Sequence, residues 1–174
     1  MSTEVDRTLT WPDCSIYRIT RSSADTGGEL LEMEWELPAN GWGPQPHVHP
    51  RLTEEYEVLD GSLDVLLGSE WRTLTARDAA SVPPGTVHTF RVGAGPVRVR
   101  NVHRPALDFE PYIERLCSAA NQRDLGDLSS IRALLCVAVL VREYPQHSRA
   151  PGRVLNAAVP ALAALGRLLG FRTT

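Results

Sequence analysis

The sequence predicts a mainly β domain followed by a helical C-terminal extension. From Asp13 to about Arg104, short apolar segments are separated by Gly, Pro and Asp, which is typical of a β-sandwich or barrel. After Arg104 the apolar residues follow a helical period instead. We therefore expect a β-barrel domain over residues 1–104 and a helical extension over residues 105–174, which packs on the barrel or on a dimer partner.

The clearest strand is predicted over residues 31–37. Its apolar residues alternate with glutamates, so one face of the strand would be buried and the other exposed to water. Residues 62–67 and 70–74 flank a Gly-Ser pair and predict a hairpin. Residues 97–103 alternate again and predict a further strand.

Three helices are expected after the strands. Asp108 is expected to cap a helix that runs to about Ala120, and Ser129 is expected to cap one over residues 130–143. A third helix is expected over residues 154–169.

The third predicted helix carries an apolar stripe, and Pro160 is expected to kink it. The stripe consists of Leu155, Val159, Leu162, Leu165 and Leu169. We expect it to pack on the barrel or across a dimer. The alternative is a helix on a membrane surface, although such helices usually carry more basic residues on their polar face.

Composition excludes several classes of protein. The formal net charge is -3, and the N-terminal half is acidic, which argues against nucleic-acid binding. All eighteen basic residues are arginines, so catalysis through a lysine Schiff base is excluded. The three cysteines form no C-x-x-C pair, which favours a reducing cytoplasm over a disulfide framework. We expect neither a cleaved signal nor a membrane span, because no apolar run is long enough.

The segment GWGPQPHVHPRLTEEYEVLDG, residues 41–61, contains two of the five histidines. His47 and His49 are two residues apart, so on a strand both imidazoles would project to the same face. Glu54 lies an odd number of residues further on, and a turn at the Pro50-Arg51 pair would bring it to that face. Downstream, a Pro-Gly turn precedes His88 and makes a fourth ligand available.

Three imidazoles and one carboxylate suit one divalent transition metal ion, such as Fe, Mn, Ni, Cu or Zn. Calcium and iron-sulfur clusters are excluded because they prefer other ligand types. Burying these groups together without a metal or water would be costly. The predicted metal ligands are His47, His49, Glu54 and His88.

These two segments resemble the two motifs of the cupin superfamily. Together they are similar to the 3-His, 1-Glu metal motif of germin-like members. Gly41, the three residues His47, His49 and Glu54, and Gly61 fit every position of G-x5-H-x-H-x4-E-x6-G. In the second motif, G-x5-P-x-G-x2-H-x3-N, the sequence matches at Pro83, Gly85 and His88. Arg77 replaces its first glycine and Val92 its asparagine, whose place Asn101 could take. The resemblance covers about residues 28–103 and implies a jelly-roll double-stranded β-helix and the metal site.

Further residues are predicted to surround the metal. By parity, His103 is expected to face the cavity and to act as a proton carrier, although a strand-end histidine without a catalytic part is the alternative. Glu54 is expected to take a proton as well as to bind the metal. The expected substrate pocket consists of Met33, Trp35, Tyr56, Phe90 and Asn101, with barrel filling as the alternative. His147, in a polar linker, is expected to be solvated.

Three functions are open on the sequence alone. The resemblance implies first a dioxygenase-like oxidoreductase that acts on a small hydrophobic or aromatic metabolite. A metal-dependent isomerase or cyclase is the second, for which Arg51, Arg72 and Arg91 are the cations near the cavity. The third is a non-catalytic module that binds a small molecule. We expect a homodimer in each case, because exposed edge strands commonly pair.

Overall fold

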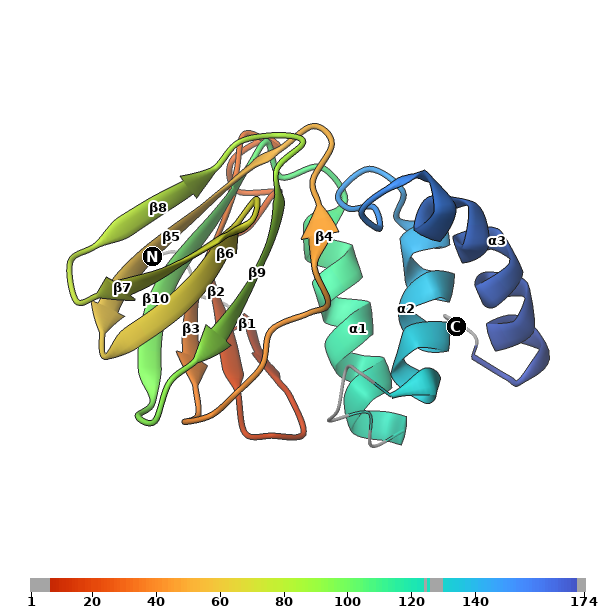
Figure 1. Ribbon diagram of the computed structural model, residues 1–174, viewed down its shortest axis with the longest axis horizontal. Coiled ribbons are helices and arrows are strands. Elements are labelled where there is room, and N and C mark those ends of the chain that lie inside the picture. The colour runs from red at the N-terminus through yellow and green to blue at the C-terminus, as the bar shows by residue number, and fades with distance from the viewer. Residues whose placement is uncertain (1–6, 124, 126–129, 172–174) are drawn as a thin grey trace.

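The computed structural model of the protein describes residues 7–123, 125 and 130–171. In this part of the chain, ten antiparallel strands form two sheets that face each other as a jelly roll, and three helices follow (Figure 1). The six-stranded sheet has the order β1-β2-β3-β10-β5-β8, and the four-stranded sheet has the order β4-β9-β6-β7. The predicted mainly β fold is therefore confirmed.

The strands of the larger sheet are β1 (Arg7–Thr10), β2 (Ile16–Arg21), β3 (Leu31–Leu37), β10 (Val97–Arg104), β5 (Thr53–Asp60) and β8 (Ala79–Val82). Those of the smaller sheet are β4 (His47–Val48), β9 (Val87–Val92), β6 (Ser62–Leu67) and β7 (Glu70–Thr75). The strand expected over residues 31–37 and the hairpin of β6 and β7 are both present. Strand β1 precedes the predicted β region, and its short, mostly exposed sequence shows no alternation that could have revealed it.

The interior of the barrel follows from the period of two. In β3 the residues at 31, 33, 35 and 37 are buried, and the glutamates between them are only half-buried. Strand β5 repeats this pattern, with Glu54, Tyr56 and Val58 buried. Glu55 and Glu57, which alternate with these buried residues, point outward. Inward-facing positions of the two strands thus share one core.

The turn before β8 tolerates the arginine that replaces a motif glycine. Arg77 adopts a φ of 77°, the left-handed region that favours glycine. The carboxylate of Asp78 holds the turn by accepting hydrogen bonds from the backbone N–H and the hydroxyl of Thr75, at 2.8 and 2.7 Å. At Gly61, where φ is 81°, a Cβ would also collide with the Pro96 carbonyl oxygen.

The helices are α1 (Phe109–Arg123), α2 (Ile131–Glu143) and α3 (Arg153–Leu168). The side chain of Ser130 caps α2 by accepting a hydrogen bond from the N–H of Ala133, whereas Ser129 lies outside the described residues. Within the described residues, the helices are too short or too polar to cross a bilayer.

The helices form a layer on one side of the sheets, with α1 nearest the strands and α3 farthest (Figure 1). Helix α3 packs on α2 through Ala163 and Gly166, which are its buried residues, and Gly166 closely approaches Leu135 and Val139. Of the predicted stripe, Val159 and Leu162 are partly buried beside this contact. The side chains of Leu155, Leu165 and Leu169 stay exposed, so contact across a dimer remains a prediction for them. In this chain α2 lies between α3 and the strands (Figure 1).

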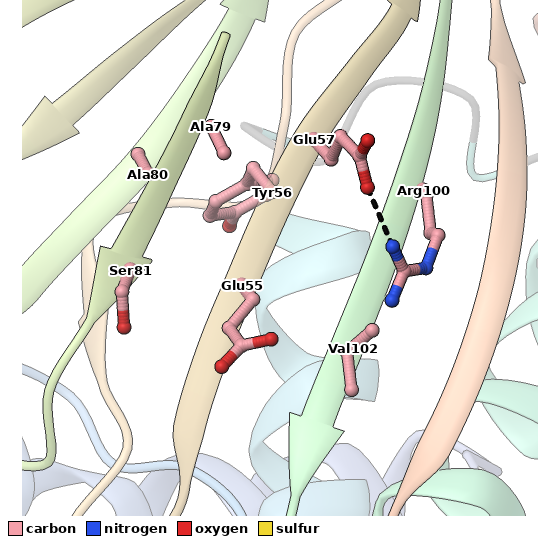
Figure 2. Close-up of a pocket in the computed structure, with 8 residues that line it drawn as sticks. All are labelled: Glu55, Tyr56, Glu57, Ala79, Ala80, Ser81, Arg100 and Val102. Atoms are coloured by element: carbon pink, nitrogen blue, oxygen red, sulfur yellow. Dashed lines mark hydrogen bonds and ion pairs between the residues drawn. The ribbon is translucent and has the colours of Figure 1, made fainter. Parts of the chain in front are cut away.

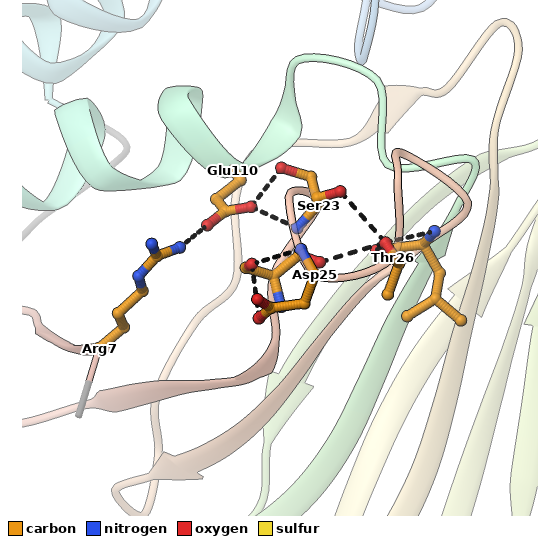
Figure 3. Close-up of polar contacts among 7 residues, drawn as sticks. Arg7, Ser23, Asp25, Thr26 and Glu110 are labelled. Carbon is orange, nitrogen blue, oxygen red and sulfur yellow. Dashed lines mark hydrogen bonds and ion pairs between the residues drawn. The ribbon is translucent and has the colours of Figure 1, made fainter. Parts of the chain in front are cut away.

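Helix α1 is joined to the barrel through Glu110, which is buried (Figure 3). Its carboxylate accepts a hydrogen bond from Arg7 Nη1 at 2.8 Å and from the backbone N–H of Ser23 at 2.6 Å. At the other end of α1, the amide of Asn121 donates to the carbonyl oxygen of Thr10 at 2.7 Å. The first helix is therefore held to β1 and to the loop after β2.

Candidate metal centre

The four predicted ligands come from three strands and one turn. His47 in β4 lies directly opposite His88 in β9. The chain bends at residues 50–51 after His49, and Glu54 is the first buried residue of β5. The bend therefore shifts the alternation of inward and outward side chains by one residue, as expected from the Pro-Arg pair. It brings the carboxylate of Glu54 to the face of the histidines.

The ligand atoms of these four residues all lie within 4.8 Å of one another. Glu54 Oε2 is 3.1 Å from His49 Nε2 and 2.9 Å from His88 Nε2. His49, Glu54 and His88 are buried, whereas His47 is half-buried and forms the most accessible side of the cluster. The predicted set thus converges on one point.

Each imidazole is oriented by a backbone carbonyl group. Nδ1 of His47 lies 3.1 Å from Gln45 O, Nδ1 of His49 lies 2.6 Å from His147 O, and Nδ1 of His88 lies 2.9 Å from Thr86 O. Since a carbonyl oxygen can only accept, each Nδ1 carries a proton, and in the neutral ring Nε2 is then the atom with the lone pair that faces the cluster. This is the tautomer that a metal ligand needs.

The residues present fit a divalent transition metal. Nε2 of His88 is fully buried, and its close polar neighbour among the described residues is Glu54 Oε2, at 2.9 Å but without hydrogen-bond geometry. A buried imidazole nitrogen and a buried carboxylate that make no aligned hydrogen bond are costly, and a cation bound between them would satisfy both. Three imidazoles and one carboxylate are also the donor types that borderline divalent ions prefer.

The pKa values show how strongly these groups interact. Burial and the imidazoles of His88 and His49 lower the pKa of His47 well below its usual value, so this ligand is neutral. Burial alone would raise the pKa of Glu54, but His103 and the two imidazoles outweigh it and hold that pKa well below its usual range. Burial would lower the pKa of His88, yet the carboxylate of Glu54 raises it. A metal would take the place of the proton that this pair attracts.

Two polar residues of β10 complete the surroundings of Glu54. Nδ2 of Asn101 donates to Glu54 Oε1 at 2.8 Å, so this amide lies beside the ligand cluster, as expected. His103 is the register partner of Glu54, and its Nε2 lies 3.5 Å from the same oxygen. Its ring stacks on Phe109 with centroids 3.7 Å apart, and burial lowers its pKa to about 3.

Comparison with known proteins identifies the fold. Residues 33–103 match the cupin domain family. This part of the chain is a cupin domain. A curated relative, quercetin 2,3-dioxygenase of Bacillus subtilis (strain 168), is 30% identical over 115 residues, which are 66% of this chain and 33% of that protein. The chain thus spans a third of the length of that relative.

A solved structure supports the same fold. An RmlC-like cupin from Shewanella frigidimarina NCIMB 400 has a TM-score of 0.52 at 18% identity, covering 63% of this chain and 93% of that chain. KdgF from Halomonas sp. has a TM-score of 0.49 at 23% identity, covering 55% of this chain and 83% of that chain. The α-helical region follows the part that matches the cupin domain.

The residues predicted to form a substrate pocket lie inside the cupin barrel and pack on one another. Met33, Trp35, Tyr56 and Phe90 are all buried. The ring centroids of Trp35 lie 5.9 Å from Tyr56 and 5.5 Å from Phe90. They form an apolar wall of the interior. Tyr56 connects this wall to the metal ligands, because it is close enough to Glu54 for that carboxylate, together with burial, to raise the pKa of Tyr56.

A pocket of about 300 Å³ lies elsewhere, along β5, β8 and β10 (Figure 2). Its lining includes the ion-paired side chains of Glu57 and Arg100. The pocket is therefore distinct from the histidine cluster. Its small residues Ala79, Ala80 and Ser81 leave the space at the edge of the sheet.

His147 corrects one expectation from the sequence. It was expected to be solvated, but its side chain is fully buried and its Nδ1 lies 3.2 Å from Asp108 Oδ1. Its carbonyl oxygen is the acceptor for His49. Local sequence could not reveal this role, because a polar linker gives no signal of the tertiary contact that buries it.

The three arginines near the cavity are engaged elsewhere. Arg51 donates to Gln146 at 2.7 Å, Arg72 lies 3.5 Å from Glu70, and Arg91 donates to Asp64 at 3.0 Å. All three pairs lie toward the surface. This arrangement gives no support to the sugar-phosphate form of the isomerase hypothesis.

Proposed function

We propose that the protein is a metal-dependent oxidoreductase of the dioxygenase type that acts on a small hydrophobic or aromatic molecule. The observation that carries the proposal is the convergence of His47, His49, Glu54 and His88 next to an aromatic interior wall. The similarity to a protein named quercetin 2,3-dioxygenase supports this chemistry.

The chemistry needs no second cofactor. A dioxygenase places both atoms of O2 in its product, so the substrate itself supplies the electrons. A redox-active divalent ion held by the four ligands would supply the one-electron chemistry that this reaction requires.

The side chains around the ligands would handle the substrate and its protons. Asn101 holds one carboxylate oxygen of Glu54, which leaves the other oxygen directed at the imidazoles. We assign to Glu54 the acceptance of a proton from an acidic hydroxyl group of the substrate. His103 Nε2 lies 3.5 Å from the oxygen that Asn101 holds, and because burial lowers its pKa to about 3 we assign it a neutral ring beside the proton and not the role of its acceptor.

The apolar wall would select the substrate. Trp35, Tyr56 and Phe90 present aromatic rings, and Met33 is a flexible side chain that can adapt to a ligand. We therefore propose that the substrate lies between this wall and Asn101, with its polar group toward the metal ligands.

The test is oxygen consumption with a panel of phenolic and diketone compounds, measured on wild type and His49→Ala. We expect substrate-dependent consumption by the wild type, its loss in His49→Ala, and unchanged rates in the control Glu57→Gln, whose side chain points outward. Turnover without oxygen consumption would support the isomerase or cyclase instead. Binding of a compound without any turnover would support a non-catalytic module.

We also propose a homodimer in the cytoplasm. Strands β1 and β8 are the edges of the larger sheet and can pair with a second copy. All three cysteines are free thiols, which suits a reducing compartment. Light scattering at micromolar concentration should give the mass of two chains, and a single-chain mass would contradict the dimer.

A further inference from the structure

We infer that the segment between α2 and α3 is a positioning element for the metal site, and that Asp108 fixes it in place. This segment, residues 144–150, is called the strap below. The inference rests on the proposed metal site and adds to it a role for the helical extension.

The strap is bonded directly to β4, the strand that carries His47 and leads into His49. Val48 of β4 and Arg149 exchange two backbone hydrogen bonds, of 3.0 and 2.8 Å. The carbonyl oxygen of His147 accepts the Nδ1 proton of His49 at 2.6 Å, and the side chain of Gln146 accepts from Arg51 at 2.7 Å. Strand β4 has only two residues and lies at the edge of its sheet, so the strap supplies its second bonded neighbour.

Asp108 ties the strap to the start of α1. One carboxylate oxygen accepts from the backbone N–H of Gln146 at 3.0 Å, and the other lies 3.2 Å from Nδ1 of His147. The His147 ring also packs against the ring of Tyr112, and the two ring centroids lie 3.9 Å apart. Asp108 lies in the short connection between β10 and α1, so the barrel fixes its position. Asp108 in turn fixes the position of the strap.

His49 differs from the other histidine ligands in where its acceptor comes from. His47 and His88 each donate Nδ1 to a carbonyl group two residues earlier in the chain. The acceptor for His49 is 98 residues away, in the strap. The tautomer and ring orientation of this one ligand therefore depend on the helical extension, whereas those of the other two are set locally.

This dependence should be reciprocal. If the strap improves the binding of a metal ion by orienting His49, then the bound ion must stabilise the strap by the same free energy. The helical extension is then a part of the metal site and not only a cover on the barrel.

The test uses cobalt(II) ion alone, with affinity from calorimetry and the ligand environment from the visible absorption of the bound ion. We expect Asp108→Ala to bind cobalt more weakly, by at most the roughly 10- to 100-fold typical when a ligand loses its direct partner, because Asp108 acts on His49 through His147, and to change the absorption bands. Asp108→Asn keeps one acceptor oxygen and should fall between wild type and Asp108→Ala.

Asp78→Ala is the matched control. Asp78 also anchors a turn through a backbone N–H and a side chain, but this turn is bonded to Val58, at the far end of β5 from Glu54. We expect its cobalt affinity and spectrum to equal those of the wild type. A folded Asp108→Ala with unchanged affinity and spectrum overturns the inference. Wild type that binds no cobalt overturns the proposed metal site itself.

Hydrogen exchange on the wild type tests the inference without a variant, in case Asp108→Ala does not fold. Cobalt should slow exchange in the strap, at the amide of Arg149 above all, because that amide is bonded to Val48. Exchange in the strap that cobalt leaves unchanged, while the ligand strands become protected, overturns the inference.

Discussion

Strands β5 and β10 lie side by side and carry ionisable groups on both faces, but the two faces use them differently. On the inner face, Glu54 is 3% exposed and is surrounded by imidazoles and by the amide of Asn101. On the outer face, Glu57 is ion-paired with Arg100 beside the pocket and stays partly exposed (Figure 2). These two glutamates are three residues apart in one strand.

The difference shows that parity decides what a carboxylate in this barrel can do. An outward glutamate has water and an arginine to balance its charge, and such a pair contributes little stability. The inward Glu54 has buried imidazoles instead, which compete for one proton, so its charge is balanced well only when that proton or a cation joins them. The same residue type is therefore a surface ion pair on one face and a metal ligand on the other.

The largest effect is expected from His88→Ala, which removes a fully buried ligand. We expect the affinity for cobalt to fall by more than about 100-fold, a larger loss than an outer partner of a ligand causes. Calorimetry at neutral pH measures it. An affinity within threefold of wild type would show that the inner face does not bind the ion through this histidine.

A smaller effect is expected from Asn101→Leu. The substitution leaves one oxygen of Glu54 without its amide donor, so the free energy of unfolding of the metal-free protein should fall by about 1–3 kcal/mol. Urea unfolding in the presence of a chelator measures this loss. Cobalt affinity should fall as well, since Glu54 loses its orientation; equal stability and affinity would contradict the role of this residue.

Glu57→Gln tests the outer face at the matching position. It removes the charge that pairs with Arg100, and we expect the free energy of unfolding to change by less than about 1 kcal/mol. Cobalt binding should stay at the wild-type value. A loss of metal in this variant would mean that the two faces are coupled and that parity alone does not separate them.

The smallest effect concerns Asp64, an outward residue of β6. The hydroxyl of Thr73 and the guanidinium of Arg91 hold its pKa below the usual value. Its contribution to stability is therefore present above the unfolded pKa and is lost as the pH falls through the lower, folded pKa. Asp64→Asn should cost less than about 1 kcal/mol at pH 7 and nothing near pH 2. A cost that persists at pH 2 would contradict this account.

Most of the metal site could be predicted from the sequence because its geometry is local. His47 and His49 share a face because of their spacing, and His88 follows a turn that the Pro-Gly pair predicts. Glu54 required one further step, the bend after His49, which proline made predictable. Asn101 and His103 followed from parity within β10, and the structure places both beside Glu54.

The remainder depends on tertiary contacts that leave no local pattern. His147 lies in a polar linker, yet packing against α1 buries it and turns its carbonyl oxygen toward His49. The stripe of α3 correctly predicted a helix, but the residues that pack on α2 are the small Ala163 and Gly166, while Leu155, Leu165 and Leu169 stay exposed. Strand β1 was missed because four mostly exposed residues carry no alternation.

The metal content of protein purified without a metal-affinity column, measured for wild type and Glu54→Gln together, decides whether the inner face holds an ion. We expect near one equivalent of a divalent transition metal per chain in the wild type, and much less in Glu54→Gln, because the amide cannot balance the ion's charge. A wild type that is folded, metal-free and unable to take up iron, manganese, nickel, copper or zinc would contradict this expectation.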